Sequence, residues 1–211
     1  MTFRLLMKVR DSGMPDEGLW STFFNAPTIL TRLGFTDRRA DFAEFGCGYG
    51  TFTVAAAART HGTVFAFDIE PAMVETTQAK VQAAGLTNVR VMRRDFVTRG
   101  TGLAAGSVTY AMLFNILHAE HPVALLSEAR RILRTGGCVG VIHWNYDART
   151  PRGPDLSIRP RPEQCQQWIR EAGLQLAGTL LDLPPYHYGL VGCKSRGRSR
   201  EARGDQFLTN R

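Results

Sequence analysis

The sequence has no long apolar run, and nowhere does it approach the roughly 20 uninterrupted apolar residues that a membrane helix needs. The N-terminal apolar run stops at Lys8, before a signal-peptide core is complete, and no small-residue cleavage site follows. Charged residues are also scarce, at 21% of 211 residues against 44% hydrophobic, which is too apolar a composition for a disordered chain. These absences predict one soluble globular domain in the cytoplasm, without a membrane span.

Cysteine is sparse as well. Cys47, Cys138, Cys165 and Cys193 lie far apart and form no Cys-x-x-Cys pair. In a chain long enough to build its own core, this spacing suggests neither a zinc site nor a disulfide framework. We therefore expect all four to be small buried residues.

The net charge of +7 is unevenly distributed. Residues 194–211 hold six basic and two acidic side chains, so four of the seven net charges belong to the last eighteen residues. A basic end with few apolar residues predicts a solvated, flexible tail, with binding to RNA or an anionic surface as the alternative. The remainder divides into an N-terminal extension, residues 1–39, and a domain, residues 40–193.

Short apolar runs rich in β-branched and aromatic residues alternate with helical patterns from about residue 41 onward. The runs that predict strands are 40–45, 62–67, 89–92, 107–114, 138–144, 176–181 and 189–193. The segments that predict helices are 51–59, 71–84, 122–133 and 162–172, with one or two further helices before residue 40. Such alternation predicts an α/β fold with a mostly parallel sheet covered on both faces.

The first predicted strand leads into the segment DFAEFGCGYGTFT, which places Gly46, Gly48 and Gly50 on the turn before a helix. Glycines there allow positive φ angles and close backbone approach, and the free N–H groups of the helix start favour polar ligands. A dinucleotide fingerprint would need glycine at position 51, which is Thr51, and the Lys-Ser/Thr pair of a phosphate loop is absent. Glu44 just before the turn would repel a pyrophosphate, so the loop favours a cationic nucleoside without phosphates.

The pattern Glu-x-Gly-x-Gly-x-Gly after the first strand resembles the first motif of class I S-adenosylmethionine-dependent methyltransferases, and the resemblance spans about residues 40–145. It implies a Rossmann-like, doubly wound sheet of seven strands with the last strand antiparallel. It also implies S-adenosylmethionine as cofactor and S-adenosylhomocysteine as product. An acid that ends the second strand, Asp68, would bind both ribose hydroxyls, since a carboxylate accepts two hydrogen bonds at once.

By the same resemblance, Asp95 would accept the adenine amine and Asn115 would meet the methionine part. The cofactor residues expected in all are Glu44, Phe45, Gly46, Cys47, Gly48, Gly50, Asp68, Ile69, Met73, Asp95, Phe96 and Asn115. The alternative for Asp68 is an N-cap of the next helix, and for Met73 a place in the core.

The acceptor is expected to be a small molecule. The fourth strand ends in NILH, so the Asn/Asp-Pro-Pro-aromatic motif found there in methylases of exocyclic amines is missing, and none of the cysteines fits a cytosine C5 nucleophile. The chain is similar instead to quinone and sterol biosynthesis methyltransferases. The alternatives are an RNA methyltransferase that uses the basic tail and a catalytically silent cofactor-binding partner subunit; the chain itself is expected as a monomer or homodimer.

Three histidines are candidates for proton transfer, because imidazole titrates near neutrality, at about 6.5 unperturbed. His118 follows the fourth strand, His143 ends the fifth, and His187 precedes the last. A structural role is the alternative for each. His118, Glu120 and His121 are not expected to bind a metal, because adjacent loop positions do not point together.

Aromatic residues are expected to wall the acceptor site, where they enclose apolar groups and contact cations. The candidates are Trp20, Phe24, Trp144, Tyr186 and Tyr188, with a place in the core as the alternative. Arg159 and Arg161 are expected in a solvated loop, with contact to an acidic acceptor as their alternative role.

Overall fold

A computed structural model describes residues 16–36 and 39–195. Their strands are β1 Phe42–Phe45, β2 Val64–Asp68, β3 Val89–Arg93, β4 Val108–Phe114, β5 Leu133–Trp144, β6 Gln175–Leu176, β7 Leu181–Leu183 and β8 His187–Cys193. They form one sheet in the order β3-β2-β1-β4-β5-β8-β6, with β7 also paired to β8. The strands β1 to β5 pair in parallel, and β8 runs antiparallel to β5.

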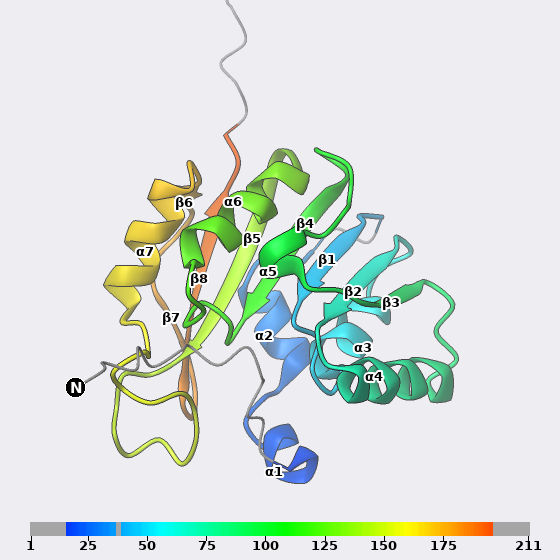
Figure 1. The fold of residues 1–211 in the computed structure, drawn as a ribbon, viewed down its shortest axis with the longest axis horizontal. Helices are drawn as coiled ribbons and strands as arrows, with labels where there is room; N and C mark the ends of the chain where they lie inside the picture. Colours follow the sequence, from blue (N-terminus) through cyan, green and yellow to red (C-terminus); the bar gives the residue numbers. More distant parts are fainter. Residues whose placement is uncertain (1–15, 37–38, 196–211) are drawn as a thin grey trace, which may run out of the picture.

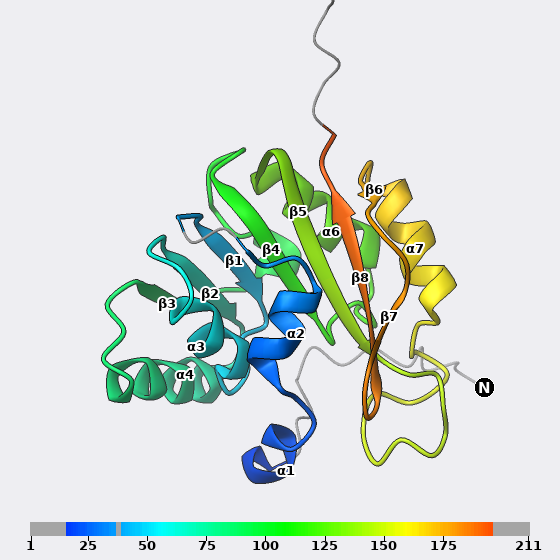
Figure 2. The same ribbon diagram turned by 180° about the vertical axis from the view of Figure 1, so that it is seen from behind.

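Helices cover both faces of this sheet (Figures 1 and 2). The described helices are α1 Glu17–Ser21, α2 Ala26–Arg32, α3 Thr51–Ala57, α4 Pro71–Ala83, α5 Phe96–Arg99, α6 Pro122–Ile132 and α7 Pro162–Glu171. α5, α6 and α7 lie on one face, whereas α2 and α3 pack against the other. Proline stands in the first turn of α4, α6 and α7, where its missing N–H costs no hydrogen bond.

The predicted Rossmann-like α/β fold with an antiparallel last strand is confirmed. The detail differs at residues 176–181, which form no single strand. The chain there leaves β6 after Leu176 and returns as β7 at Leu181, and both short strands pair with β8. Gly178 interrupts the run with a φ of 74°, which extended backbone does not allow.

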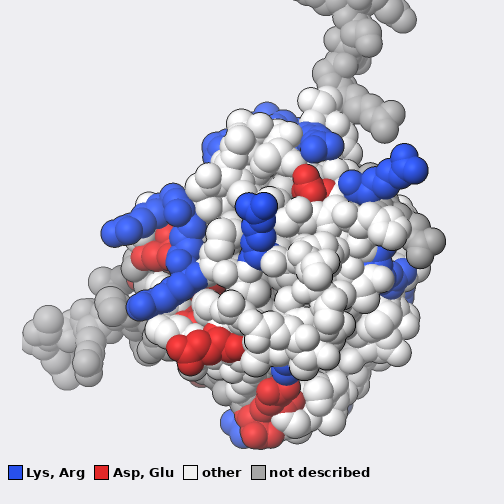
Figure 3. Space-filling model, turned by 90° about the vertical axis from the view of Figure 1, so that its right-hand side faces the viewer, with Lys and Arg blue, Asp and Glu red and all other residues white. Residues whose placement is uncertain are grey.

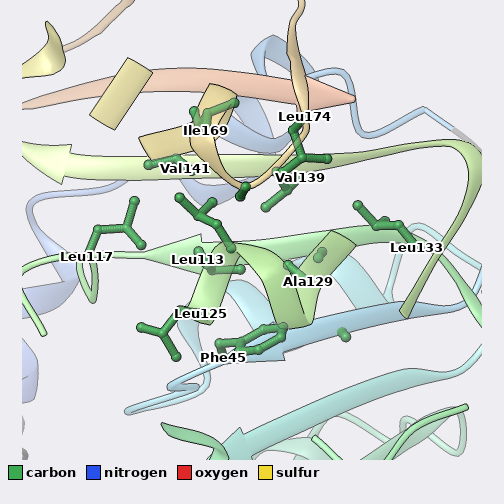
Figure 4. Packing of buried hydrophobic residues seen from close by; sticks show 14 of the residues in the cluster. Phe45, Leu113, Leu117, Leu125, Ala129, Leu133, Val139, Val141, Ile169 and Leu174 are labelled. Atoms are coloured by element: carbon green, nitrogen blue, oxygen red, sulfur yellow. The ribbon is translucent and has the colours of Figure 1, made fainter. Parts of the chain in front are cut away.

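Two clusters of buried side chains hold the layers together. Between the sheet and α6 and α7, Leu125, Ala129 and Ile169 pack onto Phe45 of β1 and Leu113 of β4 (Figure 4). The second cluster lies between the sheet and α2 and α3. Because both faces of the sheet are covered, the central strands β1 and β4 are apolar at most successive positions, as the pattern of parallel strands predicts; Glu44 and Thr109 are the exceptions.

The expectation that all four cysteines are unpaired is wrong. Cys138 and Cys193 form a disulfide, whereas Cys47 and Cys165 are free and buried. The cause is strand register, because β5 and β8 pair antiparallel with Cys138 directly opposite Cys193. A sequence separation of 55 residues hides that pairing from any local motif.

The antiparallel ladder continues past β8. The Lys194 amide donates to the Gly137 carbonyl at 2.8 Å, and the Gly136 amide donates to the Lys194 carbonyl at 2.9 Å. Residues 196–211, most of the predicted basic tail, lie outside the described residues. None of the helices in the described ranges has the length and apolar character needed to cross a membrane.

Candidate functional site

The glycine loop lies where β1 ends, beside β4. Gly46, Gly48 and Gly50 have φ angles of 77°, 52° and 75°, which glycine adopts without strain. A Cβ on Gly50 would also approach the Thr77 side chain of α4 to 2.9 Å. Thr77 itself donates its hydroxyl to the Gly48 carbonyl at 2.7 Å. The loop is therefore held against α4 with its backbone close to the sheet edge.

Asp68 holds the same loop from the end of β2. Its Oδ2 accepts the Gly48 amide at 2.9 Å and its Oδ1 accepts the Glu70 amide at 3.0 Å. Burial raises the pKa of this carboxyl, and the two amides oppose that rise. Each oxygen retains a second lone pair, so the carboxylate has capacity for further donors.

Glu44 is buried below the loop, with a side chain that is 2% exposed. The Thr53 hydroxyl of α3 donates to its Oε2. Burial raises the pKa of Glu44 to about 8, the Thr53 hydrogen bond works against this rise, and the negative charge of Asp68 adds to it. Without a bound cation, Glu44 is therefore largely protonated at neutral pH.

We expect this proton to make stability depend on pH. The folded state binds it more tightly than the unfolded chain does, so the stability it confers is complete below about pH 4.5 and is lost as the pH rises through about 8. Glu44→Gln should remove this loss, which we expect to be at least about 1.4 kcal/mol, the equivalent of one pKa unit. Urea unfolding between about pH 5 and pH 8 measures the slope.

The matched control is Glu75→Gln, which makes the same change of charge on the exposed face of α4. This variant should retain the pH dependence of the wild type. Equal slopes for wild type and Glu44→Gln would contradict the assignment of a buried, protonated Glu44.

Asn115 follows β4 in an uncommon conformation. It is the one non-glycine residue in the described ranges with a positive φ, 57°. Its amide N–H donates to the Ile142 carbonyl at 2.8 Å, whereas the side-chain Oδ1 and Nδ2 are buried without a hydrogen-bond partner. A buried unpaired polar group costs about 1–3 kcal/mol, so the arrangement calls for an explanation, and a ligand can provide one.

The other expected cofactor residues have varied surroundings. Asp95 caps α5, with Oδ1 accepting the Thr98 amide at 3.1 Å. Ile69 and Met73 are half-buried. Phe45 and Phe96 belong to the core, where their rings meet edge to face at 5.5 Å. For Cys47, burial first and then the nearby carboxyls raise the pKa of the thiol, which keeps it uncharged.

The structure brings together two of the three candidate histidines. Nδ1 of His118 lies 3.3 Å from Nε2 of His143. His143 is fully buried at the end of β5, and its Nδ1 accepts the Trp144 amide at 3.0 Å. His187 lies on the opposite face of the sheet, because it pairs with Trp144 in the β5–β8 ladder. Both of its buried ring nitrogens lack a hydrogen-bond partner, and burial lowers its pKa to about 3.

The expected aromatic wall is largely a packed cluster around His187. The centroid of the His187 ring lies 4.2 Å from that of Trp144 and 4.5 Å from that of Phe24, and the Trp20 ring lies 4.8 Å from that of Phe24, tilted by 57°. Tyr186 lies 6.4 Å from Trp144 with its ring nearly parallel. These four expected residues gather at one end of β5 and β8.

Tyr188 lies apart from that cluster, on the face of His143. It is 2% exposed and belongs to the core around α7. Its hydroxyl donates to the Pro160 carbonyl at 3.0 Å and lies 3.3 Å from Sγ of Cys165. Its hydrogen-bonding capacity is thus already used by the protein.

Arg159 departs from the expectation of a solvated loop, since it is only 7% exposed. Its guanidinium donates to the carbonyls of Asn145, Asp147 and Pro154 at 2.8–3.1 Å and so closes the loop between β5 and α7 on itself. No local pattern indicates that Arg159 is buried, because basic residues alternating with proline are typical of exposed loops. Arg161, in contrast, is exposed and stacks on Tyr146 at 3.7 Å.

An ion pair that the sequence does not predict connects α1 with α4 beside the glycine loop. Glu17 of α1 pairs with Lys80 of α4, and Lys80 donates to the Tyr49 carbonyl of the glycine loop at 2.8 Å. A Lys and a Glu 63 positions apart carry no local signal of pairing. Among the described residues, no three His, Cys, Asp or Glu side chains gather closely enough to hold a metal ion.

A Rossmann-like sheet, a glycine loop closed by an acid from β2 and a polar residue after β4 are the arrangement that the resemblance to class I S-adenosylmethionine-dependent methyltransferases implies. Residues 42–137 match the family model described as a methyltransferase domain. S-adenosylmethionine, the cofactor that the resemblance implies, is the cofactor of this class of methyltransferases.

Known proteins similar to this chain support the fold. A SAM-dependent methyltransferase from Aquifex aeolicus matches with a TM-score of 0.73 and 21% identity over 81% of this chain and 90% of its own. Geranyl diphosphate C-methyltransferase from Streptomyces coelicolor A3(2), solved with Mg2+, geranyl diphosphate and S-adenosyl-L-homocysteine, matches with a TM-score of 0.67 and 17% identity over 80% and 76% of the two chains.

One curated relative matches in sequence. It is an uncharacterized 37.1 kDa protein in a transposon of Streptomyces fradiae, 36% identical over 174 residues. The match includes 74% of this chain and 47% of the relative. The chain therefore spans about half the length of that protein.

Proposed function

We propose that the protein transfers a methyl group from S-adenosylmethionine to a small-molecule acceptor. The observation that carries the proposal is Asn115, whose buried side-chain amide has no partner beside the glycine loop. The glycine loop lies next to Asn115, as the contact with the following residue shows: a Cβ added to Gly46 would lie 3.1 Å from Cγ2 of Ile116. An amide that can donate and accept at once fits a ligand with an ammonium and a carboxylate, as in the methionine part of the cofactor.

The other residues fit the same ligand. The lone pairs that remain on Asp68 are suited to two ribose hydroxyls, and Asp95 with the Phe96 backbone is suited to the adenine amine. Ile69 and Met73, both half-buried, would border the base. The cofactor supplies an electrophilic methyl group, so the chain has to bind both reactants, exclude water and align the acceptor.

The acceptor would lie beyond the methionine part, toward β5. His118 is half-buried there, beside His143. Trp20, Phe24, Trp144 and Tyr186 gather around His187 at the end of β5, on the other face of the sheet. The geranyl diphosphate methyltransferase among the similar structures acts on a small molecule. Figure 3 shows basic side chains separated by acidic ones on the face beside β3 and α4, with no continuous basic stripe on that face for a nucleic acid.

Asn115→Gly tests the role of the amide. Removing an unpaired buried amide and placing glycine at a positive φ should raise the free energy of unfolding of the ligand-free protein by about 1–2 kcal/mol. The same change should weaken S-adenosylmethionine binding about tenfold, because a ligand hydrogen bond is lost. Urea unfolding and titration calorimetry measure the two effects.

Asn88→Gly is the matched control, because it removes a side-chain amide that already has protein partners. Nδ2 of Asn88 donates to the carbonyls of Ala57, Thr60 and Gly62. This variant should lose stability and keep its affinity for the cofactor. If Asn115→Gly binds S-adenosylmethionine as the wild type does, the amide has no ligand and the proposal loses its main support.

A further inference from the structure

His187 is buried at the start of β8 with both of its ring nitrogens unpaired. The residue is 0% exposed, and neither Nδ1 nor Nε2 has a hydrogen-bond partner among the described residues. Burial lowers its pKa to about 3, so the imidazole is neutral and offers one N–H donor and one acceptor nitrogen. A buried donor and a buried acceptor without partners destabilise a fold, so the arrangement calls for a partner that the described residues do not supply.

One side of the His187 ring lies against a wall that the protein holds in place. The centroid of the Trp144 ring is 4.2 Å from that of His187, and the two residues are paired in the β5–β8 ladder. The loop after β5 covers Trp144, since a Cβ added to Gly153 would lie 2.8 Å from Cγ of Trp144. Arg159 closes this loop by donating to several of its carbonyls. Trp144 is therefore a fixed surface of the cluster.

The other side of the ring is covered by residues 16–25, which consist of α1 and the link to α2 and are called the lid below. Phe24 lies 4.5 Å from His187 and Trp20 lies 4.8 Å from Phe24, measured between ring centroids. Both covering side chains are only half-buried, so the ring over His187 itself reaches solvent. No residue of α1 is buried, and its ion pair between Glu17 and Lys80 is partly exposed and therefore weak. The lid is thus the side that can open.

The Phe24 ring lies beside the residues proposed to bind the cofactor. It meets the ring of Phe52 at 5.2 Å, and Phe52 stands two positions after Gly50 of the glycine loop. Phe52 in turn meets Phe114 at 4.7 Å, and Phe114 directly precedes Asn115. α1 and the loop after β5 lie at this same end of the sheet (Figures 1 and 2). A ring in the place of Phe24 would therefore lie next to both segments.

We propose that the methyl acceptor is an uncharged aromatic compound with a hydroxyl group, that its ring binds against Trp144 in the place of the Phe24 ring, and that its hydroxyl pairs with His187. The proposal rests on the proposed methyl transfer and specifies its substrate class. The lid moves aside to admit the ring, and Trp20 then closes over it. His187 is a binding residue that sets specificity.

The chemistry of the cluster selects this class of compound. Flat aromatic walls favour a flat ring, which packs against them in offset or edge-to-face geometry. A hydroxyl both donates and accepts, so it can pair with either nitrogen of the neutral imidazole. A charged group is disfavoured, because a neutral imidazole among apolar rings does not compensate the burial of a charge.

The three tryptophans of the chain report where such a ring binds. Trp20 and Trp144 line the proposed site, whereas Trp168 packs with α7 on the other face of the sheet. In heteronuclear NMR spectra of the full chain, p-cresol should shift the indole signals of Trp20 and Trp144 and leave that of Trp168 unchanged. A shift of Trp168 alone, or no shift near the solubility limit of the probe, would overturn the proposal.

His187→Phe tests the hydrogen bond, with p-cresol and p-xylene as two probes that differ only by a hydroxyl in place of a methyl group. The affinity for p-cresol relative to p-xylene should fall about tenfold in this variant, because the buried hydroxyl then has no partner. His61→Phe is the matched control, since His61 is exposed ahead of β2, and it should keep the ratio of the wild type. An unchanged ratio in His187→Phe would contradict the pairing of the hydroxyl with His187.

Phe24→Ala distinguishes a ring that gives way to the acceptor from a wall of its site. The variant should bind p-cresol at least about threefold more tightly than the wild type, because no side chain has to be displaced. Leu19→Ala shortens an exposed side chain of the same lid and should leave the affinity unchanged. Equal or weaker binding by Phe24→Ala would overturn the proposed position of the ring. If His187→Phe does not fold, this variant and the tryptophan signals decide.

Calorimetry with S-adenosylhomocysteine separates the two proposals. A protein that binds it but gives a contrary result with p-cresol retains the proposed function and loses this inference. A protein that binds p-cresol at His187 but does not bind S-adenosylhomocysteine has the aromatic site and loses the proposed methyl transfer.

Discussion

Reduction of the Cys138–Cys193 disulfide is expected to lower the free energy of unfolding by about 4 kcal/mol at 25 °C, because the bond closes a loop of 55 residues in the unfolded chain. The bond joins the first half of β5 to the end of β8. The hydrogen bonds of Lys194 with Gly136 and Gly137 continue the pairing of the two strands just beyond it. Urea unfolding with and without a reductant measures the difference, and a change below about 1 kcal/mol would contradict the expectation.

Two variants show whether a change on reduction comes from this bond. The double variant Cys138→Ser, Cys193→Ser should have the stability of the reduced wild type and no response to the reductant. Cys165→Ala removes a free, buried thiol and leaves the disulfide in place, so it should still lose about 4 kcal/mol on reduction. A reductant effect that persists in the double variant would have to come from another source.

Local patterns in the sequence predicted most of the fold. The strands up to β5 and the helices α3, α4, α6 and α7 lie within a few residues of their expected bounds, apart from β5, which begins five residues earlier at Leu133. Apolar runs, prolines at helix starts and glycines after helix ends are properties of neighbouring residues, so a single sequence displays them.

Contacts between distant positions were not predictable in the same way. The disulfide depends on the register of β5 with β8, and the burial of Arg159 depends on a loop that folds back over its guanidinium. The pairing of His118 with His143 depends on how the loop after β4 turns against the end of β5. Each of these contacts is set by tertiary packing, and no spacing in the chain encodes it.

The candidate site shows the same division. The motif identified Asp68 and the glycine loop, and the structure joins them through the Gly48 amide. Asn115 was expected near the methionine part, but only its positive φ and its unpaired amide show that the chain carries a destabilising arrangement there. In natural proteins, strained backbone and unpaired buried polar groups occur mainly at functional sites. The conformation of Asn115 therefore supports a functional role for this residue.

Asp68→Ala is expected to weaken S-adenosylmethionine binding about a hundredfold, because each hydrogen bond to a charged group contributes about 1.5–3 kcal/mol. The substitution removes the carboxylate that we propose as the acceptor of the ribose hydroxyls, and it also releases the Gly48 amide, so the loop loses its hydrogen bond to the end of β2. Titration calorimetry with S-adenosylmethionine measures the affinity, and an unchanged value would contradict the assignment of the cofactor site.

Asp41→Ala separates loss of the ligand contact from loss of a carboxylate that supports backbone. Asp41 precedes β1 at the opposite end of the strand, and its Oδ1 accepts the Thr63 amide at 2.7 Å, much as Asp68 accepts that of Gly48. Each variant therefore loses a buried or half-buried acceptor for a backbone amide, and both should be less stable. Only Asp68→Ala should lose affinity, because only the carboxyl end of β2 faces the loop; equal affinity losses in the two variants would show that general destabilisation is the cause.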